Sequence, residues 1–124
     1  MFCRGIRGAT VADLNTRETI LAETQNLLES LIRENNLSMA SIASIFFSTT
    51  TDLNAEFPAL AARHLGLVDT PLLCFHEMNV AGSLPKCIRI LIHVNSEKPQ
   101  SEMKHLYLKE AASLRPDLLA AQAK

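Results

Sequence analysis

The sequence predicts an α+β domain in which a mixed β-sheet carries one long helix and one shorter helix. Residues 16–35 repeat apolar side chains with helical spacing, whereas several shorter runs, above all 87–94, are rich in the branched residues typical of strands. These segments are interspersed along the chain, as in mixed α and β domains. The 124 residues fit a single domain. We expect it to span residues 1–118 and to be followed by a flexible tail, 119–124.

The first strand is expected at residues 2–12, where Gly5 and Gly8 interrupt the run. Glycine inside a strand often marks a bulge, or a place where a ligand or another backbone comes close. The segment therefore predicts a strand with an unusual contact or conformation at one or both glycines.

The long helix is expected over residues 16–35, with its apolar side chains on one face. Asn15 and Glu18 have the spacing of a capping box, although that motif prefers Ser or Thr at the cap. Asn35 and Asn36 are expected to end the helix.

The second helix is expected to open at Phe57-Pro58, because proline suits the first helical turn, and to close at Gly66. Further strands are expected at residues 41–49, 71–75 and 87–94, followed by a short final pair of segments at 105–108 and 110–114. Four or five strands with one long helix leave much of the sheet uncovered, so we expect an oligomer to cover the remaining apolar face.

Composition excludes several classes of protein. The net charge is −1 and no basic stripe is present, so nucleic acid is not an expected partner. The apolar runs are far shorter than the roughly 20 residues of a membrane span, and no apolar signal segment opens the chain. Three widely spaced cysteines without a CxxC motif indicate reduced thiols in a cytoplasmic protein. The four histidines lack metal-ligand spacing, so no metal is expected.

Arg89 is the most informative position. On a strand, Ile88, Ile90 and Ile92 share one purely apolar face, while Arg89 lies on the other. An arginine is almost never buried unpaired, because an uncompensated buried charge is costly. Arg89 therefore needs either an internal carboxylate, such as that of Glu77, or an anionic ligand. Spacing alone leaves these two alternatives balanced.

Three further arginines are weaker candidates. Arg7 lies near the glycines of the first strand, where a ligand could come close, although an ordinary surface arginine is the more frequent case. Arg63, on the second helix, and Arg115, after the last apolar segment, have the positions of solvated helix-end charges.

Cys74 and His76 share a face of a strand, which suggests a cysteine nucleophile, but no orienting partner for the histidine is evident. Cys74 and Glu77 point to opposite faces unless the strand ends between them. Tyr107, the only tyrosine, suits either packing or hydroxyl donation. Arginines, one carboxylate and one phenol suit the binding of an anion and the stabilisation of a polarised transition state, without cofactor or metal.

The chain resembles the AroH-class chorismate mutases from its start to about residue 118. The matching motifs, in order, are Arg4-Gly5-Ile6-Arg7-Gly8-Ala9-Thr10, Phe57-Pro58-Ala59 followed by Arg63, Cys74-Phe75-His76-Glu77-Met78, Lys86-Cys87-Ile88-Arg89, and Tyr107-Leu108 with Leu114-Arg115-Pro116-Asp117-Leu118. Each motif is weak alone, and their order and spacing together are specific. Leu60 and Leu72-Leu73 make the expected pocket rim more apolar than is usual in this family.

The resemblance implies a homotrimer with a pseudo-α/β barrel and with active sites at subunit interfaces. It also implies the Claisen rearrangement of chorismate to prephenate on the path to phenylalanine and tyrosine. By family analogy, Arg89 reaches the ether oxygen, and Glu77 and Cys74 contact the ring hydroxyl region. The other implied substrate contacts are Arg7, Phe57, Ala59, Arg63, Leu72, Leu73, Tyr107, Leu114 and Arg115.

Two alternatives remain open at this point. One is a reactive-intermediate deaminase, a trimeric family of related architecture whose signature motifs are not seen here. The other is a trimer that binds an aromatic-pathway metabolite without catalysis. Leu60, and a segment between Arg63 and Cys74 that is one residue shorter than in the family, favour it modestly.

Overall fold

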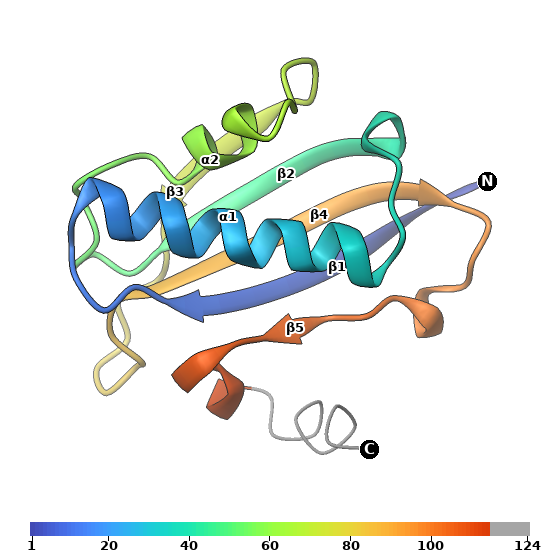
Figure 1. Cartoon of the computed structure of the whole chain (residues 1–124). Coiled ribbons are helices and arrows are strands. Elements are labelled where there is room, and N and C mark those ends of the chain that lie inside the picture. The colour runs from blue at the N-terminus through green and yellow to red at the C-terminus, as the bar shows by residue number, and fades with distance from the viewer. Residues whose placement is uncertain (115–124) are drawn as a thin grey trace.

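The computed structural model describes residues 1–114, in which five strands form one sheet beneath two helices (Figure 1). The strands are β1 (Phe2–Val11), β2 (Ile42–Thr49), β3 (Leu72–His76), β4 (Cys87–Ser96) and β5 (Leu106–Tyr107). The helices are α1 (Arg17–Glu34) and α2 (Ala59–His64), with 3₁₀ turns η1 (Met39–Ser41), η2 (Gln100–Glu102) and η3 (Lys109–Leu114). The predicted α+β class is confirmed.

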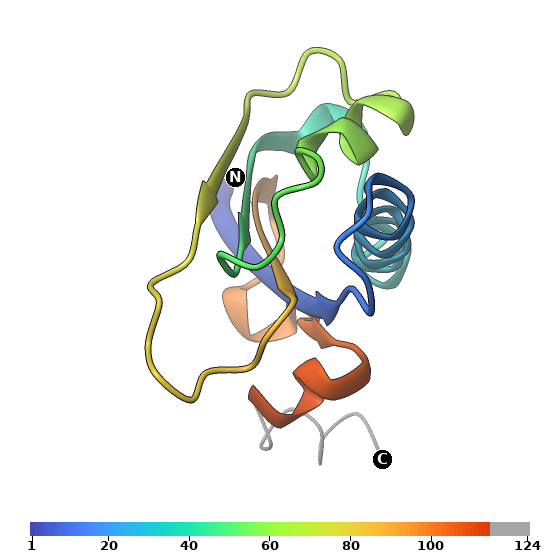
Figure 2. The same cartoon turned by 90° about the vertical axis from the view of Figure 1, so that its left-hand side faces the viewer.

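The sheet is mixed, with the strand order β3-β2-β4-β1-β5. The central strand β4 is antiparallel to both β1 and β2, whereas the edge strands β3 and β5 are parallel to their neighbours β2 and β1. The crossovers through α1 and α2 step across the sheet in the same direction. Because such crossovers are right-handed, both helices must lie on the same face, as Figure 2 shows.

The core lies between this face and α1. Ile90, Ile92 and Val94 of β4 are at most 1% exposed and pack with Leu27 and Leu31 of the helix. The predicted apolar face of residues 87–94 is thus confirmed. Burying each such side chain contributes roughly 1.5–3 kcal/mol, so this strand anchors the residues that it carries on its other face.

The predicted cap of α1 is wrong by one residue. Thr16 is the N-cap, and its hydroxyl accepts a hydrogen bond from the Thr19 N–H at 3.1 Å. The Asn15 side chain instead accepts from the backbone N–H groups of Asn54 and Ala55, at 3.0 and 3.1 Å. The threonine hydroxyl serves the cap because it precedes the first helical residue directly, which frees Asn15 to anchor the loop before α2.

The predicted ends of both helices are confirmed. Asn35 caps α1, and Asn36 follows it with a left-handed φ of +50°. Gly66 ends α2 with a φ of +101°, a conformation that glycine adopts without steric cost.

Of the two glycines in β1, only Gly8 marks a close approach. The pairing of β1 with β4 runs through both without a bulge. A Cβ on Gly8 would lie 2.9 and 3.0 Å from Leu31 and Leu27 side-chain carbons and 3.1 Å from the Leu106 carbonyl oxygen. A Cβ on Gly5 would meet nothing nearer than 3.9 Å. Gly8 therefore lets α1 and β5 come close to β1.

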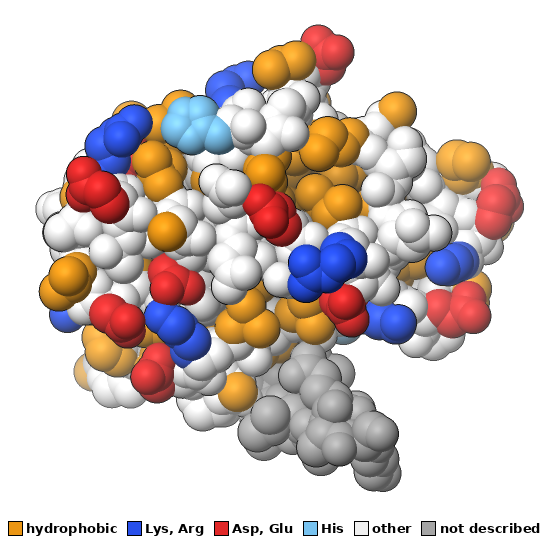
Figure 3. Space-filling view, viewed as in Figure 1, with side chains coloured by type: hydrophobic (Ala, Val, Ile, Leu, Met, Phe, Trp, Pro, Cys, Tyr) orange, Lys and Arg blue, Asp and Glu red, His pale blue; other side chains and the backbone are white. Residues whose placement is uncertain are grey.

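The sheet face opposite α1 and α2 is here called the open face (Figure 2). Within residues 1–114 it carries no α-helix, and the 3₁₀ turn η3 packs on it beside Ala9 and Tyr107. Leu73 and Phe75 of the edge strand β3 are 57% and 49% exposed there. The helix-covered side shows acidic and basic side chains interspersed with hydrophobic ones (Figure 3). None of the helices in the described part of the chain is long and apolar enough to cross a membrane.

Candidate active site

The open face brings Arg7, Arg89 and Tyr107 together from three adjacent strands. Ala9 of β1 pairs with Arg89 on one side and with Tyr107 on the other, and neighbouring strands lie roughly 4.8 Å apart. Arg7 lies two residues before Ala9, so it occupies the same face. With Glu77, these residues form what we call the floor: Arg7, Glu77, Arg89 and Tyr107.

Arg89 and Glu77 form a partly exposed ion pair. The strand β3 ends at His76, and the Glu77 N–H donates to the Thr49 carbonyl at 2.8 Å. The Glu77 carboxylate then lies 3.7 Å from Nε of Arg89, with side chains 34% and 23% exposed. This distance is too long for a hydrogen bond, so the buried Nε has no hydrogen-bond partner among residues 1–114. Of the two alternatives for Arg89, the internal carboxylate is present, and an anionic ligand stays a prediction to which the unpartnered Nε is open.

Cys87 was not predicted as part of the site, although it alternates onto the face of Arg89. Burial raises the pKa of the Cys87 thiol, and the neighbouring Arg89 guanidinium acts in the opposite direction. The thiol is 1% exposed and lies close to the Arg89 guanidinium.

The Tyr107 hydroxyl has no hydrogen-bond partner within the described residues, and the side chain is 5% exposed. Its ring packs in a cluster with Ala9, Ala111 and Leu114. An unsatisfied buried hydroxyl costs about 1–3 kcal/mol, so a ligand or a neighbouring chain that accepts a hydrogen bond from it would relieve that cost. Arg115, also predicted for the site, lies outside the described residues.

The other predicted site residues gather at the sheet edge, around β3 and α2. We call them the rim: Phe57, Ala59, Arg63, Leu72, Leu73 and Cys74. Phe57 is 72% exposed and, with Cys74, lines a pocket of about 350 Å³. Arg63 is exposed, and its Nη1 donates to the Val68 carbonyl at 3.4 Å.

The Cys74 thiol is not activated for nucleophilic attack. Burial raises the pKa of Cys74, and only a backbone hydrogen bond at Ala59 opposes that shift. Since the thiolate is the nucleophile, a raised pKa leaves Cys74 as a neutral packing group. His76, which shares the pocket, instead lies 3.2 Å from the Thr49 hydroxyl. Thr49 and Glu56 also line the pocket without having been predicted. The only signal for Glu56 was its place directly before Phe57, and the sequence held none for Thr49.

In one chain the floor lies on the open face, whereas the rim is divided between the two sides of the sheet. Leu72 and Cys74 of β3 pack toward the helices, and Leu73 between them faces the open side. Cys74 pairs with Phe47 and packs on the core under the helices, whereas Arg89 pairs with Ser48 on the open face. The strand does end between Cys74 and Glu77, yet the two side chains still serve different sides. Within residues 1–114 no group of three or more His, Cys, Asp or Glu side chains could hold a metal ion.

Comparison with known proteins identifies relatives over nearly the whole chain. The family model described as chorismate mutase type I matches residues 3–118. The protein named chorismate mutase AroH of Bacillus subtilis (strain 168) is 44% identical over 119 residues, which cover 95% of this chain and 94% of the relative. That of Thermus thermophilus is 44% identical over 120 residues, with 96% and 98% covered. A solved chorismate mutase from Clostridium thermocellum superposes with a TM-score of 0.87 at 48% identity and covers 88% of this chain and 97% of its own.

Proposed function

The chain belongs to the type I chorismate mutase family, and from that premise we propose how its floor and its rim convert chorismate to prephenate. The enzyme is an isomerase of aromatic amino-acid biosynthesis. Its reaction is intramolecular: one carbon–oxygen bond breaks, one carbon–carbon bond forms, and no proton or nucleophile is exchanged. The protein therefore has to select a compact substrate conformer and stabilise the charge that develops on the ether oxygen.

The proposed active unit is a homotrimer in which the floor of one subunit faces the rim of its neighbour. The observation that carries this proposal is the division of the site within one chain, since Arg89 and Cys74 lie on opposite faces of the sheet. The exposed Leu73 and Phe75 on the open face also need cover. In a closed cyclic trimer every subunit uses the same two surfaces, so three equivalent complete sites form.

Arg89 is the proposed ligand of the ether oxygen. Enzymatic accelerations begin at about a million-fold, or roughly 8 kcal/mol. One preorganised donor aimed at a developing oxyanion contributes roughly 2.7–4 kcal/mol, and holding reacting atoms in the productive geometry contributes several more. Arg89 suits this task because β4 is packed into the core and its guanidinium has a donor atom without a hydrogen-bond partner in the described chain.

The remaining floor and rim residues are proposed to bind and shape the substrate. Arg7 would bind a carboxylate, the Tyr107 hydroxyl would add a hydrogen bond, and Glu77 would meet the ring hydroxyl region. The neighbour's Cys74 approaches the same region. The apolar wall is assigned to Phe57, Ala59, Leu72, Leu73 and Leu114, and the guiding of the dianion to Arg63 and Arg115.

Two further proposals concern the whole chain. Residues 1–118 are proposed to form a single domain, which the one continuous sheet and its shared core support. A cytoplasmic location is proposed because all three cysteines are free thiols, as expected in a reducing compartment.

The proposed function is tested by measuring both the activity of the purified protein and the molar mass of its assembly in solution. Purified protein should deplete chorismate absorbance far above the spontaneous rate, and light scattering should give about three times the 13.7 kDa chain mass. Activity in a stable monomer would contradict the divided site. A trimer that binds chorismate without depleting it would contradict the assigned roles of the floor.

A further inference from the structure

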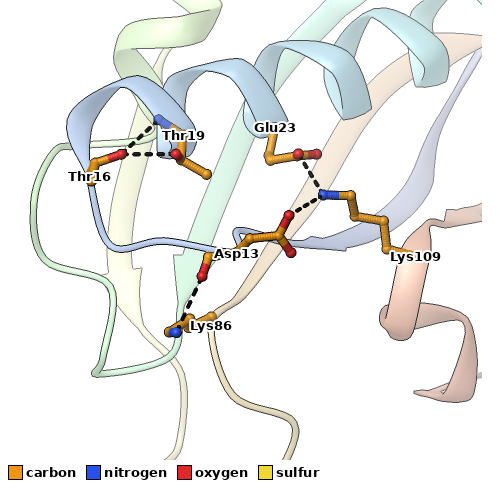
Figure 4. A network of polar contacts seen from close by, with 6 residues as sticks. All are labelled: Asp13, Thr16, Thr19, Glu23, Lys86 and Lys109. Atoms are coloured by element: carbon orange, nitrogen blue, oxygen red, sulfur yellow. Dashed lines mark hydrogen bonds and ion pairs between the residues drawn. The ribbon is translucent and has the colours of Figure 1, made fainter.

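Lys109 joins three segments next to the floor. It begins η3, two residues after Tyr107, and its ammonium lies 2.7 Å from the Glu23 carboxylate on α1 and 3.4 Å from that of Asp13, after β1 (Figure 4). The hydrogen bond to Glu23 raises the pKa of Lys109, so the ammonium is charged throughout the neutral range. Asp13 is exposed, whereas the Glu23 side chain is only 20% exposed.

The backbone of Lys109 has a φ of +53°. A side-chain-bearing residue adopts this left-handed conformation rarely, and it persists only when the surroundings fix it. Here the contacts of the ammonium with the carboxylates of Glu23 and Asp13 supply such a constraint. The turn matters because it connects Tyr107 to Leu114, which pack in the same cluster.

The strand that carries Tyr107 is held by side-chain packing more than by backbone pairing. Leu106 and Leu108 pack on the main core, and the Asn35 side chain bonds the backbone of Lys104. β5 is two residues long, lies at the sheet edge, and pairs with β1 only through Gly8 and Ala9. Its flanks add a hydrogen bond from the Leu108 N–H to the Ala9 carbonyl and one from the Arg7 N–H to His105, both 2.9 Å. Because the backbone pairing is so short, contacts at the end of β5 add to what keeps the segment from opening locally.

The residues around Asp13, directly after β1, also contact the start of β4, the strand that carries Arg89. Lys86, directly before β4, is a second left-handed lysine, with a φ of +50°. Its Nζ donates to the Asp13 carbonyl at 3.3 Å, and its own carbonyl accepts from the Ala12 N–H at 2.9 Å. The residues around Asp13 therefore contact both the start of β4 and the end of β5 (Figure 4).

We propose that Lys109 is a positioning residue, whose ion pairs with Glu23 and Asp13 hold Tyr107 in the floor at a fixed place relative to Arg89. The inference rests on the proposed function of Tyr107 as a substrate contact. The competing interpretation is an ordinary surface ion pair, which would add slightly to stability and leave Tyr107 unaffected.

The chain offers a direct readout that needs no substrate, because Tyr107 is the only tyrosine and tryptophan is absent. Tyrosine fluorescence and its quenching by acrylamide thus report on Tyr107 alone. Lys109→Gly keeps the left-handed backbone accessible but removes the ammonium, and Glu23→Gln removes one charge without changing shape. Both should raise the quenching constant about twofold by loosening the segment. Lys109→Arg keeps the positive charge and should therefore have the quenching constant of the wild type.

Arg33→Ala is the matched control, since it breaks the exposed Arg33–Glu34 pair at the far end of α1. It should leave Tyr107 quenching unchanged. Quenching that stays at the wild-type value in both Lys109→Gly and Glu23→Gln overturns the proposal, as does an equal rise in the control. Glu23→Gln keeps the test decisive should Lys109→Gly fold poorly.

Kinetics provide the second arm. Lys109→Gly should raise KM several-fold with kcat changed by less than about twofold, as expected when a binding contact is lost. In a Tyr107→Phe background it should add no further rise, because coupled residues are not additive. If Lys109→Gly raises KM by the same factor in the Tyr107→Phe variant as in the wild type, the proposal is overturned. Should Tyr107→Phe alone leave KM and kcat unchanged, the role of Tyr107 in binding is wrong, and quenching still decides whether Lys109 positions it.

Discussion

The floor and the rim are built in contrasting ways. The floor carries its two arginines on β1 and β4, strands whose opposite faces pack in the core, so Arg89 has little freedom to move. The rim uses mainly apolar groups on an edge strand and a six-residue helix, with Phe57 and Leu73 exposed. The part that must place a charge is rigid, whereas the part that supplies shape lies at the surface.

Each half also lacks what the other provides. The floor contains buried polar atoms without hydrogen-bond partners in residues 1–114, Nε of Arg89 and the Tyr107 hydroxyl. The rim exposes apolar side chains to water. A dianionic substrate held between a floor and a neighbouring rim would satisfy the first and cover the second. The comparison therefore predicts different kinetic consequences for changes in the two regions.

The largest expected effect comes from removing the floor's central charge. Arg89→Met keeps an unbranched side chain but no donor, and it should lower kcat about 100- to 1,000-fold while changing KM far less. Chorismate depletion under saturating substrate measures it. The control is Arg4→Ala. Arg4 also lies on β1 but donates to the Lys98 carbonyl, so this variant should keep a kcat near that of the wild type. Near-normal turnover of Arg89→Met would remove Arg89 from the mechanism.

The next effect tests whether the two halves come from different subunits. Arg89→Met inactivates the floor, and Arg63→Glu should repel the dianion at the rim. Co-refolding the two at equal amounts should restore roughly a quarter of wild-type activity at low substrate, because one site in four combines an intact floor with an intact rim. Mixing without refolding is the control. No recovery in trimers of proven mixed composition would place both halves in one chain.

A smaller effect is expected when the floor loses a binding charge. Arg7→Ala should raise KM roughly ten-fold or more, since a charge-assisted bond to a carboxylate contributes about 1.5–3 kcal/mol. The turnover number at saturation should stay within a few-fold. Initial rates over a range of chorismate concentrations separate the two parameters. A fall in kcat at unchanged KM would contradict the binding role of Arg7.

The smallest effect on activity is expected from Gly8→Ala, which changes how tightly β5 packs beside the floor and acts mainly on the free energy of unfolding. Gly8→Ala should destabilise the protein by about 1–3 kcal/mol, because overpacking forces the neighbours to shift and one neighbour is the Leu106 backbone. Denaturant unfolding measures this change. Gly5→Ala in the same strand meets only a side-chain carbon at 3.9 Å and should be nearly neutral. Equal stability of the two variants would contradict the close packing of β5 on β1.

The elements themselves were predictable because their signals are local. The alternation through Ile88, Ile90 and Ile92 placed Arg89 on the opposite face from the core, as the structure confirms. The helix start was misplaced at Asn15, because two adjacent residues both suit a cap and only the fold shows that Asn15 bonds to the loop at Asn54. Cys87 could not be assigned to the site from the sequence, because only the packing of β4 shows that its thiol lies close to Arg89.

The sequence by itself determined the family, the element order and the identity of the groups that could act on an anion. Residue spacing and motif order carry that information without any contact between distant segments. Only the tertiary structure decided that Arg89 and Cys74 lie on opposite faces, that Ala9 separates Arg89 from Tyr107, and that Lys109 contacts both Glu23 and Asp13. These relations depend on strand order and register, which are set by the packing of the whole sheet against its helices.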